Sequence, residues 1–224
     1  RDFCLSRGLG DVYKRQGASP VVRSVVYALI VAVVGTLFAA LFAYYMDRRR
    51  IPGRAFFDCI ATMPYMLPGT CFGIGYILAF NHAPLKLTGT AIIVLANMLF
   101  KQLPTSAKIC SATLAQLQPA QERSAQDLGA GRLAVIRDVV LPNMRPALLS
   151  CFVYNFTSSM TTAGAIIFLI DPSRQLAVFR LFDAVYRGDY ALASVLASVI
   201  TAIVLAVEGL VWLLSRKEGK RRVS

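Results

Sequence analysis

Residue types that carry out catalysis or bind metals are sparse in this sequence. It has one histidine, His82, and five cysteines that form no Cys-x-x-Cys pair. A structural zinc site needs four nitrogen or sulfur ligands, so no metal site is predicted, and the cysteines are interpreted as small buried hydrophobic residues. Neither a phosphate-binding Gly-x4-Gly-Lys-Ser/Thr loop nor a Ser/His/Asp arrangement occurs. We therefore predict that the chain is not an enzyme and holds no cofactor.

The composition instead indicates a membrane protein. Of 224 residues, 56% are hydrophobic and 16% are charged, whereas soluble domains carry about 25% charged residues. The apolar residues gather into long uncharged runs, and a membrane-spanning helix needs roughly 20 such residues. We predict an all-α polytopic membrane protein with about five transmembrane helices. These spans are expected at 24–46, 59–80, 87–100 (extending past Lys101), 146–170 and 190–207 (extending past Glu208 to Leu214).

Two of these runs contain residues that allow more than one interpretation. Pro64 and Pro68 lie inside the second run, where they predict either a broken helix near a pathway or an ordinary kink. The fourth run carries Ser158, Thr161 and Thr162, which are candidates for a translocation path. Small and hydroxyl residues also mediate close packing between membrane helices, so both interpretations stay open.

The first sixteen residues have a different character from the rest. Residues 11–16 read DVYKRQ and resemble the translation of a sequencing-library adapter. We treat residues 1–16 as a non-native segment and exclude them from the fold. Residues 17–224 are then expected to form one transmembrane domain with a cytoplasmic loop at about 104–145.

The distribution of Lys and Arg predicts the orientation. The net charge is +12, but the basic residues lie at the ends of apolar runs, which disfavours nucleic acid as a partner. Cytoplasmic loops of membrane proteins are enriched in Lys and Arg. If the loop after the first span is cytoplasmic, that side holds fifteen basic residues against four outside, with Arg23 at the first span's entry. The N-terminus is predicted outside and the C-terminus inside. The four outer residues are Lys86, Arg174, Arg180 and Arg187.

The long connection between the third and fourth spans is patterned rather than random. Residues 116–137 read as two short amphipathic helices separated at Gly129. The pair Leu141-Pro142 is expected to end this helical region, and Pro146 to open the next span. An ordered helical pair outside the bilayer needs a partner surface. The predicted apolar contacts are Leu117, Ala125, Leu128, Leu133 and Val135.

The stretch SAQDLGAGRLAVIRDVVLPNMRPAL resembles the cytoplasmic signature loop of binding-protein-dependent permeases in ATP-binding cassette importers. The family's loop has a Glu-Ala-Ala triplet, a glycine four residues later and an Ile-x-Leu-Pro ending. Here Gly129 and Leu141-Pro142 match, but the triplet reads Arg123-Ser124-Ala125, and Glu122 lies one place early. The resemblance implies a coupling loop that grips the ATPase. Its residues would be Ser124, Ala125, Asp127, Leu128, Gly129, Ala130, Val139, Leu141 and Pro142.

The resemblance extends over the five spans and implies the fold of type I importer permeases. The stretches MPYMLPGTCFGIGYILAF and SSMTTAGAIIFLIDPSRQLAVFRLFDAVYRGDYALAS are most similar to the ferric-iron branch. The chain would then be an inner-membrane subunit that moves ferric iron, driven by a separate ATPase subunit. The implied partners are that ATPase, a periplasmic substrate-binding protein, and a second permease half, identical or homologous. Permeases for 2-aminoethylphosphonate and polyamines are similar and remain alternatives.

Two other function classes compete with the permease interpretation. A membrane scaffold or receptor without transport would have no need for a loop that grips an ATPase. A secondary transporter would carry charged residues near the bilayer midplane, and the expected spans have none there. The loop at 116–142 is therefore the segment that separates these classes.

Overall fold

The computed structural model describes residues 19–48, 53–81, 89–162, 164, 166, 169 and 175–223. The predicted adapter segment 1–16 and several basic residues of the charge count (Arg49, Arg50, Lys86 and Arg174) lie outside the described residues, as does His82. Within the described ranges the regular elements are all helical. The elements are α2 (Ser19–Arg48), α3 (Arg54–Met66), α4 (Gly69–Phe80), α5 (Ala91–Gln116), α6 (Pro119–Asp127), α7 (Arg132–Val135), the π-helix η1 (Ile136–Val140), α8 (Leu141–Asn143), α9 (Arg145–Thr161), α10 (Ala177–Tyr186) and α11 (Tyr190–Val223).

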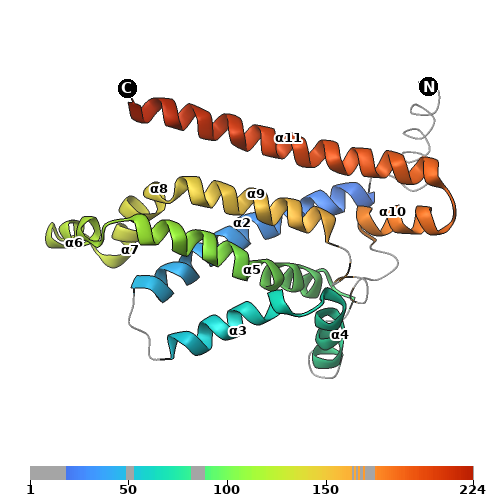
Figure 1. Ribbon diagram of the computed structural model, residues 1–224, viewed down its shortest axis with the longest axis horizontal. Coiled ribbons are helices and arrows are strands. Elements are labelled where there is room, and N and C mark those ends of the chain that lie inside the picture. Colours follow the sequence, from blue (N-terminus) through green and yellow to red (C-terminus); the bar gives the residue numbers. More distant parts are fainter. Residues whose placement is uncertain are drawn as a thin grey trace.

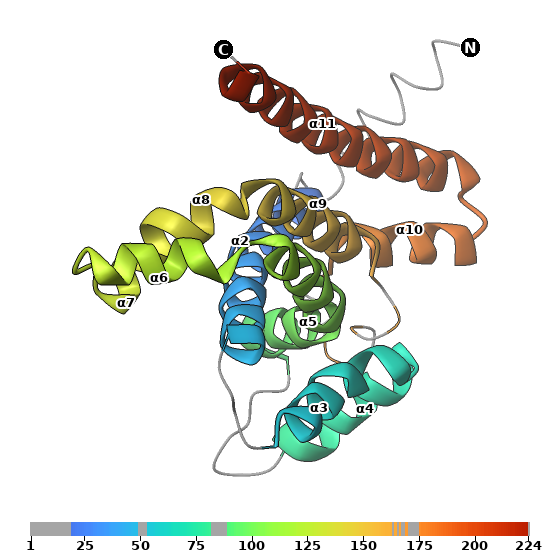
Figure 2. The same cartoon turned by 60° about the vertical axis from the view of Figure 1, so that its left-hand side comes forward.

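Three helices form the centre of the molecule. α2 packs along both α5 and α9, and α11 crosses over α9 and α10 (Figure 1). The contact between α2 and its neighbours is close because small residues line it: Ala28, Ala32, Ala39 and Ala43 are fully or almost fully buried. Small side chains let membrane helices approach each other closely, where dispersion contacts hold them together. α6, α7 and α8 project from one end of this bundle (Figure 2).

The second apolar run is broken rather than kinked. α3 and α4 meet at an angle of 112° across a break of a few residues. Leu67 is extended (φ −82°, ψ 139°) and Pro68 precedes the first turn of α4. A proline removes a backbone donor and disfavours the helical conformation of the preceding residue, so the helix ends there. Of the two alternatives left open for this run, the break is found at Pro68, whereas Pro64 lies inside α3.

The expected span boundaries need correction. By length and apolar composition, the described helices supply two spans, Pro20–Arg48 and Tyr190–Arg216, or three if the bent pair crosses as one. The third span was expected at 87–100, but α5 begins at Ala91 and continues to Gln116. The fourth was expected to reach residue 170, but α9 ends at Thr161. The count of about five spans stays a prediction.

Hydroxyl groups explain the early end of α9. Thr161 Oγ1 donates to Thr157 O at 3.0 Å, and Thr162 Oγ1 donates to Ser158 O at 2.6 Å. Such bonds compete with the backbone ladder and weaken a helix. Thr162 then turns to an extended conformation, and its N–H closes the helix on Ser158 O at 2.9 Å.

Two acidic residues near the ends of apolar runs have partners. Glu208 of α11 accepts a hydrogen bond from Thr157 Oγ1 of α9 at 3.3 Å. Asp58 of α3 pairs with Lys108 of α5 at 3.0 Å. Each contact joins two helices. The position of an acidic residue in the sequence does not reveal such a partner, because the partner lies on another helix.

Candidate functional site

The turn between α6 and α7 is a complete helix-capping motif. Gly129 has φ +89°, a left-handed conformation that glycine adopts at low cost. Its N–H donates to Gln126 O at 2.9 Å, and the N–H of Ala130 donates to Ala125 O at 3.0 Å. These two bonds define a Schellman cap, which satisfies the last carbonyls of α6. The predicted break at Gly129 is therefore found, with Leu128 at the cap of α6.

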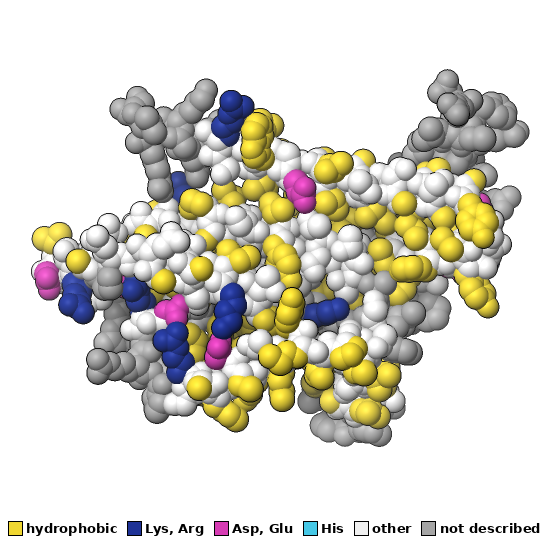
Figure 3. Space-filling view, viewed as in Figure 1, with side chains coloured by type: hydrophobic (Ala, Val, Ile, Leu, Met, Phe, Trp, Pro, Cys, Tyr) yellow, Lys and Arg dark blue, Asp and Glu magenta, His cyan; other side chains and the backbone are white. Residues whose placement is uncertain are grey.

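The α6–α7 hairpin, defined as residues 119–135, has an outer face with exposed apolar side chains. Leu128 is 90% exposed and Leu133 is 80% exposed, one on each side of Gly129. Both were predicted to be apolar contacts of a helical pair that needs a partner surface, and neither is buried within the chain itself. Amphipathic spacing identifies apolar positions, but it does not tell a core contact from a contact with a partner. Figure 3 shows Lys, Arg, Asp and Glu side chains gathered over this end of the molecule.

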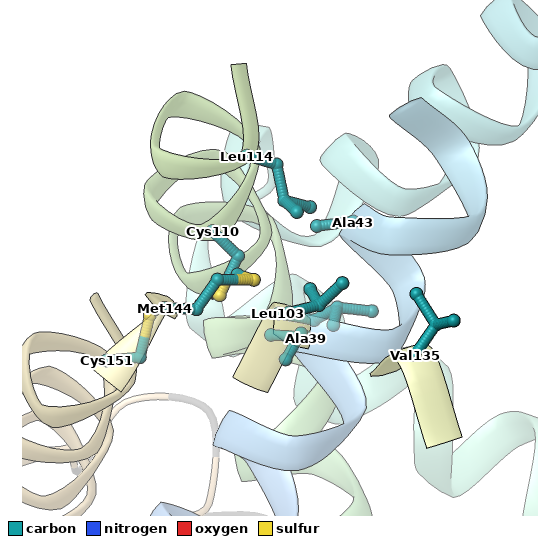
Figure 4. Packing of buried hydrophobic residues seen from close by; sticks show 10 residues of the cluster. Ala39, Ala43, Leu103, Cys110, Leu114, Val135, Met144 and Cys151 are labelled. Carbon is teal, nitrogen blue, oxygen red and sulfur yellow. Dashed lines mark hydrogen bonds between the residues drawn. The ribbon is translucent and has the colours of Figure 1, made fainter. Parts of the chain in front are cut away.

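The inner face of the hairpin packs onto the helix bundle. Ala125 and Ala130, the two residues joined by the cap, contact a buried cluster, and Val135 belongs to it. Figure 4 shows side chains of α2 and α5 facing Val135 and Met144. An ion pair between Arg48 and Glu122, at 2.9 Å, adds a polar contact at the base of the hairpin. The buried cluster comprises Ala39, Ala40, Ala43, Leu103, Cys110, Leu114, Val135, Val140, Met144 and Cys151.

The Leu-Pro ending behaves differently from the prediction. The chain stays helical through Leu141 and Pro142 and bends only at Met144, before Pro146 in the first turn of α9. The turn before Pro142 is a π-helix, with the N–H of Leu141 bonded to Ile136 O. Proline cannot continue an ordinary i to i−4 ladder, and a π-bulge accommodates the missing donor. Val139 packs against the buried cluster, and its carbonyl accepts Asn143 Nδ2 at 2.9 Å.

The candidate pathway residues are not gathered into one site. Pro64 and Pro68 lie at the α3–α4 break, whereas Ser158, Thr161 and Thr162 lie at the end of α9. Helices α3 and α4 pack mainly on α5 rather than on α9. The Thr161 and Thr162 hydroxyls bond to carbonyls of their own helix.

A buried polar layer, which sequence reasoning missed, joins α2, α5 and α9. Ser106 Oγ donates to Asn155 Oδ1 at 2.8 Å, and Asn155 Nδ2 donates to Thr36 Oγ1 at 3.3 Å. Gln102 lies 2.9 Å from Ser159 Oγ, and its NH2 group reaches Asn155 Oδ1 at 3.2 Å when turned toward it. A signal was available, because two polar residues spaced four apart occur in each of α5 and α9. That spacing places them on one helix face.

The four cysteines that the structure describes divide into two classes, and Cys4 lies outside the described residues. Cys110 and Cys151 are buried as predicted. Their sulfur atoms lie 3.7 Å apart, within hydrogen-bonding distance but not joined by a disulfide. Cys59 and Cys71 are exposed on α3 and α4, so the prediction of burial is wrong for them. Among the residues that the structure describes, His, Cys, Asp and Glu form no group of three that would hold a metal ion.

Comparison with known proteins decides the family. Residues 32–218 match the family described as the binding-protein-dependent transport system inner membrane component. The chain belongs to this family. The matched range contains the whole hairpin, α5, α9 and the second half of α2, and the predicted family membership is confirmed. The family description and the apolar helices agree on a multi-pass protein of the inner membrane.

Similar proteins are named as permease proteins of ferric and of sulfate transport systems. The chain is 33% identical over 204 residues to the ferric transport system permease protein FbpB of Actinobacillus pleuropneumoniae, covering 91% of this chain and 29% of that protein. It is 36% identical over 179 residues to a putative FbpB of Haemophilus influenzae, covering 80% and 27%. It is 30% identical over 209 residues to the sulfate transport system permease protein CysT of Salmonella typhimurium, covering 88% and 76%. The chain thus spans less than a third of the ferric relatives.

Likeness to solved structures confirms the predicted fold class. A chain of a bacterial alginate ABC transporter, in complex with an alginate-bound periplasmic protein, superposes with a TM-score of 0.76 at 14% identity. That match covers 96% of this chain and 87% of the other. A chain of the MetNI methionine ABC transporter gives a TM-score of 0.66 at 14% identity, covering 88% and 95%. At this level of identity the likeness concerns the fold.

Proposed function

We propose that this chain is the membrane-spanning permease part of an ABC importer and that the α6–α7 hairpin is its docking element for a separate ATPase subunit. The observation that carries the proposal is the exposure of Leu128 and Leu133 on either side of the Gly129 turn. This end of the molecule is rich in charged side chains, so the exposed apolar pair needs a protein partner rather than lipid. Interface cores typically hold such apolar anchors inside a polar rim.

Orientation is part of the same proposal. With the hairpin in the cytoplasm, the N-terminus lies outside and the C-terminus inside, in agreement with the distribution of Lys and Arg along the sequence. A periplasmic substrate-binding protein and a second permease half, identical or homologous, would complete the importer. We further propose that the α3–α4 break at Pro68 and the end of α9, where Thr161 is exposed, contribute to the passage for substrate as two separate places.

Ferric iron is the substrate we propose. Support comes from the ferric transport permeases, which match up to 91% of this chain at 33–36% identity. The spans hold no cluster of iron ligands among the described residues. In an importer of this kind, selection of the substrate would fall to the periplasmic binding protein. Sulfate is the second candidate, because the sulfate permease CysT matches over 76% of its own length.

The substrate is tested by uptake in cells that express the chain together with the genes flanking it. Labelled ferric iron, sulfate, 2-aminoethylphosphonate and a polyamine are supplied separately, with an ATPase-inactive strain as the control. We expect ATP-dependent uptake of iron alone. Uptake of one of the other three without iron would replace the substrate and leave the importer proposal standing. Absence of uptake for all four would overturn the importer proposal.

A further inference from the structure

Arg48, the last residue of α2, contacts two other parts of the chain at once. Its Nη2 donates to the carbonyl oxygens of Leu114 and Leu117, at 3.0 and 2.8 Å, at the end of α5. Its Nε lies 2.9 Å from Glu122 Oε1 in the first turn of α6, a contact of charges rather than an aligned hydrogen bond. Tyr44, one turn earlier on α2, donates from its hydroxyl to Glu122 Oε2 at 3.3 Å.

The chemistry of this site favours arginine. The last carbonyls of a helix have no partner within the helix and carry partial negative charge, so a cation there is stabilising. A planar guanidinium can serve carbonyls and a carboxylate together, which a lysine ammonium does less well. Glu122 is in turn favoured by the positive end of the α6 dipole. The pair is largely buried, with side chains 17% and 12% exposed, so solvent screens it less than a surface pair.

The location of the pair matters more than its strength. The apolar contacts of α6 with the bundle lie near its end, at Ala125 and the Gly129 turn. In its first turn, Ala120, Gln121 and Arg123 are all exposed, and Glu122 alone of these four faces inward. Without Glu122, the contacts of α6 itself with the bundle would lie at one end, and its first turn would be held only through the short connection from α5, where Leu117 packs against the same cluster. The Arg48 contact attaches the other end.

The position of Glu122 explains the departure from the family's signature triplet. Arg123 occupies the triplet's first place and is exposed. One residue earlier, a helical side chain is rotated by about 100°, which turns Glu122 inward onto Arg48. The glutamate of this chain therefore serves a contact within the subunit.

We propose that Arg48 is a positioning residue for ATP-driven transport, because it makes α6 move as one body with the ends of α2 and α5. This inference rests on the proposed function. A hairpin held at both ends passes the displacement of its partner to the membrane helices. A hairpin held only at its Gly129 end pivots and absorbs it.

The test compares Arg48→Met, Glu122→Gln and the double variant in the complete importer, reconstituted in lipid vesicles. Transport and ATP hydrolysis are measured together, and co-purification of the ATPase is recorded. The control is Arg187→Met, which removes an ion pair of similar length, Arg187 Nε to Asp183 Oδ1 at 3.0 Å, on α10. We expect Arg48→Met to retain the ATPase and its hydrolysis while substrate moved per ATP falls at least about tenfold, because the buried Glu122 loses its charged partner.

The remaining variants sharpen the result. Glu122→Gln should have a smaller effect, since the glutamine amide oxygen can still accept from Tyr44 or Arg48, and the double variant should be no worse than Arg48→Met alone. Arg187→Met should transport normally. An unchanged ratio of transport to hydrolysis in Arg48→Met overturns the inference. So does a parallel fall of transport, hydrolysis and protein level, which is the outcome of a merely structural contact.

A distance measurement tests the inference without the ATPase. Spin labels are placed at Gln121 on α6 and Ala112 on α5, both exposed, in a background without other reactive cysteines. We expect a narrow distance distribution in the parent chain and a broad one in Arg48→Met; equal widths overturn the inference. If the parent chain fails to bind any ATPase, the proposed function fails instead, whatever the label distances are.

Discussion

Gly129→Val should abolish transport while leaving the protein in the membrane at a near-normal level. Valine at φ +89° carries backbone strain of about 1–3 kcal/mol, and relief of that strain moves Leu128 and Leu133. Loss of a central interface contact costs about 2 kcal/mol or more, which corresponds to roughly thirtyfold weaker docking. Transport and co-purification of the ATPase are the measurements.

Two controls separate the causes. Gly188, in the turn between α10 and α11, also has a positive φ of +76°, and a Cβ there would meet no atom within 4 Å, as at Gly129. Gly188→Val should therefore carry similar strain and still bind the ATPase. Asparagine adopts the left-handed conformation more easily than valine does. The Gly129→Asn variant should therefore bind the ATPase better than Gly129→Val. Normal docking by Gly129→Val would contradict the proposed role of the turn.

Asn155→Leu should destabilise the fold itself. The change removes the partner of Ser106, Thr36 and Gln102 in the buried polar layer. It also adds bulk beside Gly35, where a Cβ would already lie 3.2 Å from Asn155 Nδ2. Hydrogen bonds between membrane helices contribute about 0.6 kcal/mol each and overpacking costs about 1–3 kcal/mol, so we expect a loss of roughly 2–5 kcal/mol.

Reversible unfolding in detergent micelles measures this loss. Ser150→Leu is the matched control. Ser150 is exposed on the same helix, and its hydroxyl donates to Pro146 O in the preceding turn of that helix. The control should change stability little. Equal unfolding free energies for Asn155→Leu and Ser150→Leu would show that the polar layer does not stabilise the bundle.

Local signals in the sequence predicted the hairpin well. A glycine between two amphipathic segments is a recognisable helix end, and the capping bonds at Gly129 form among neighbours in the sequence. The proline at 68 likewise indicated a possible break in the second apolar run. Both features depend on residues within a few positions of each other, which is why the residue pattern contained them.

Features that depend on tertiary packing were not predictable in the same way. Hydrophobic spacing marked Leu128 and Leu133 as apolar contacts. Only the folded hairpin shows that these two leucines are exposed, whereas Ala125 and Val135 face the bundle. The Arg48–Glu122 pair joins residues from different helices and leaves no local pattern. In the sequence, Arg48 is one of several basic residues after the first span, and nothing near it indicates a partner in α6.

The most direct measurement of the central claim is site-specific photo-crosslinking in cells that contain the complete importer. A benzophenone amino acid is placed at Leu128, at Leu133 and, as a control, at Tyr186, which is 92% exposed at the far end of α10. We expect Leu128 and Leu133 to crosslink to the ATPase subunit and Tyr186 not to. Crosslinking of the ATPase at Tyr186 but at neither leucine would contradict both the docking role of the hairpin and the orientation of the chain.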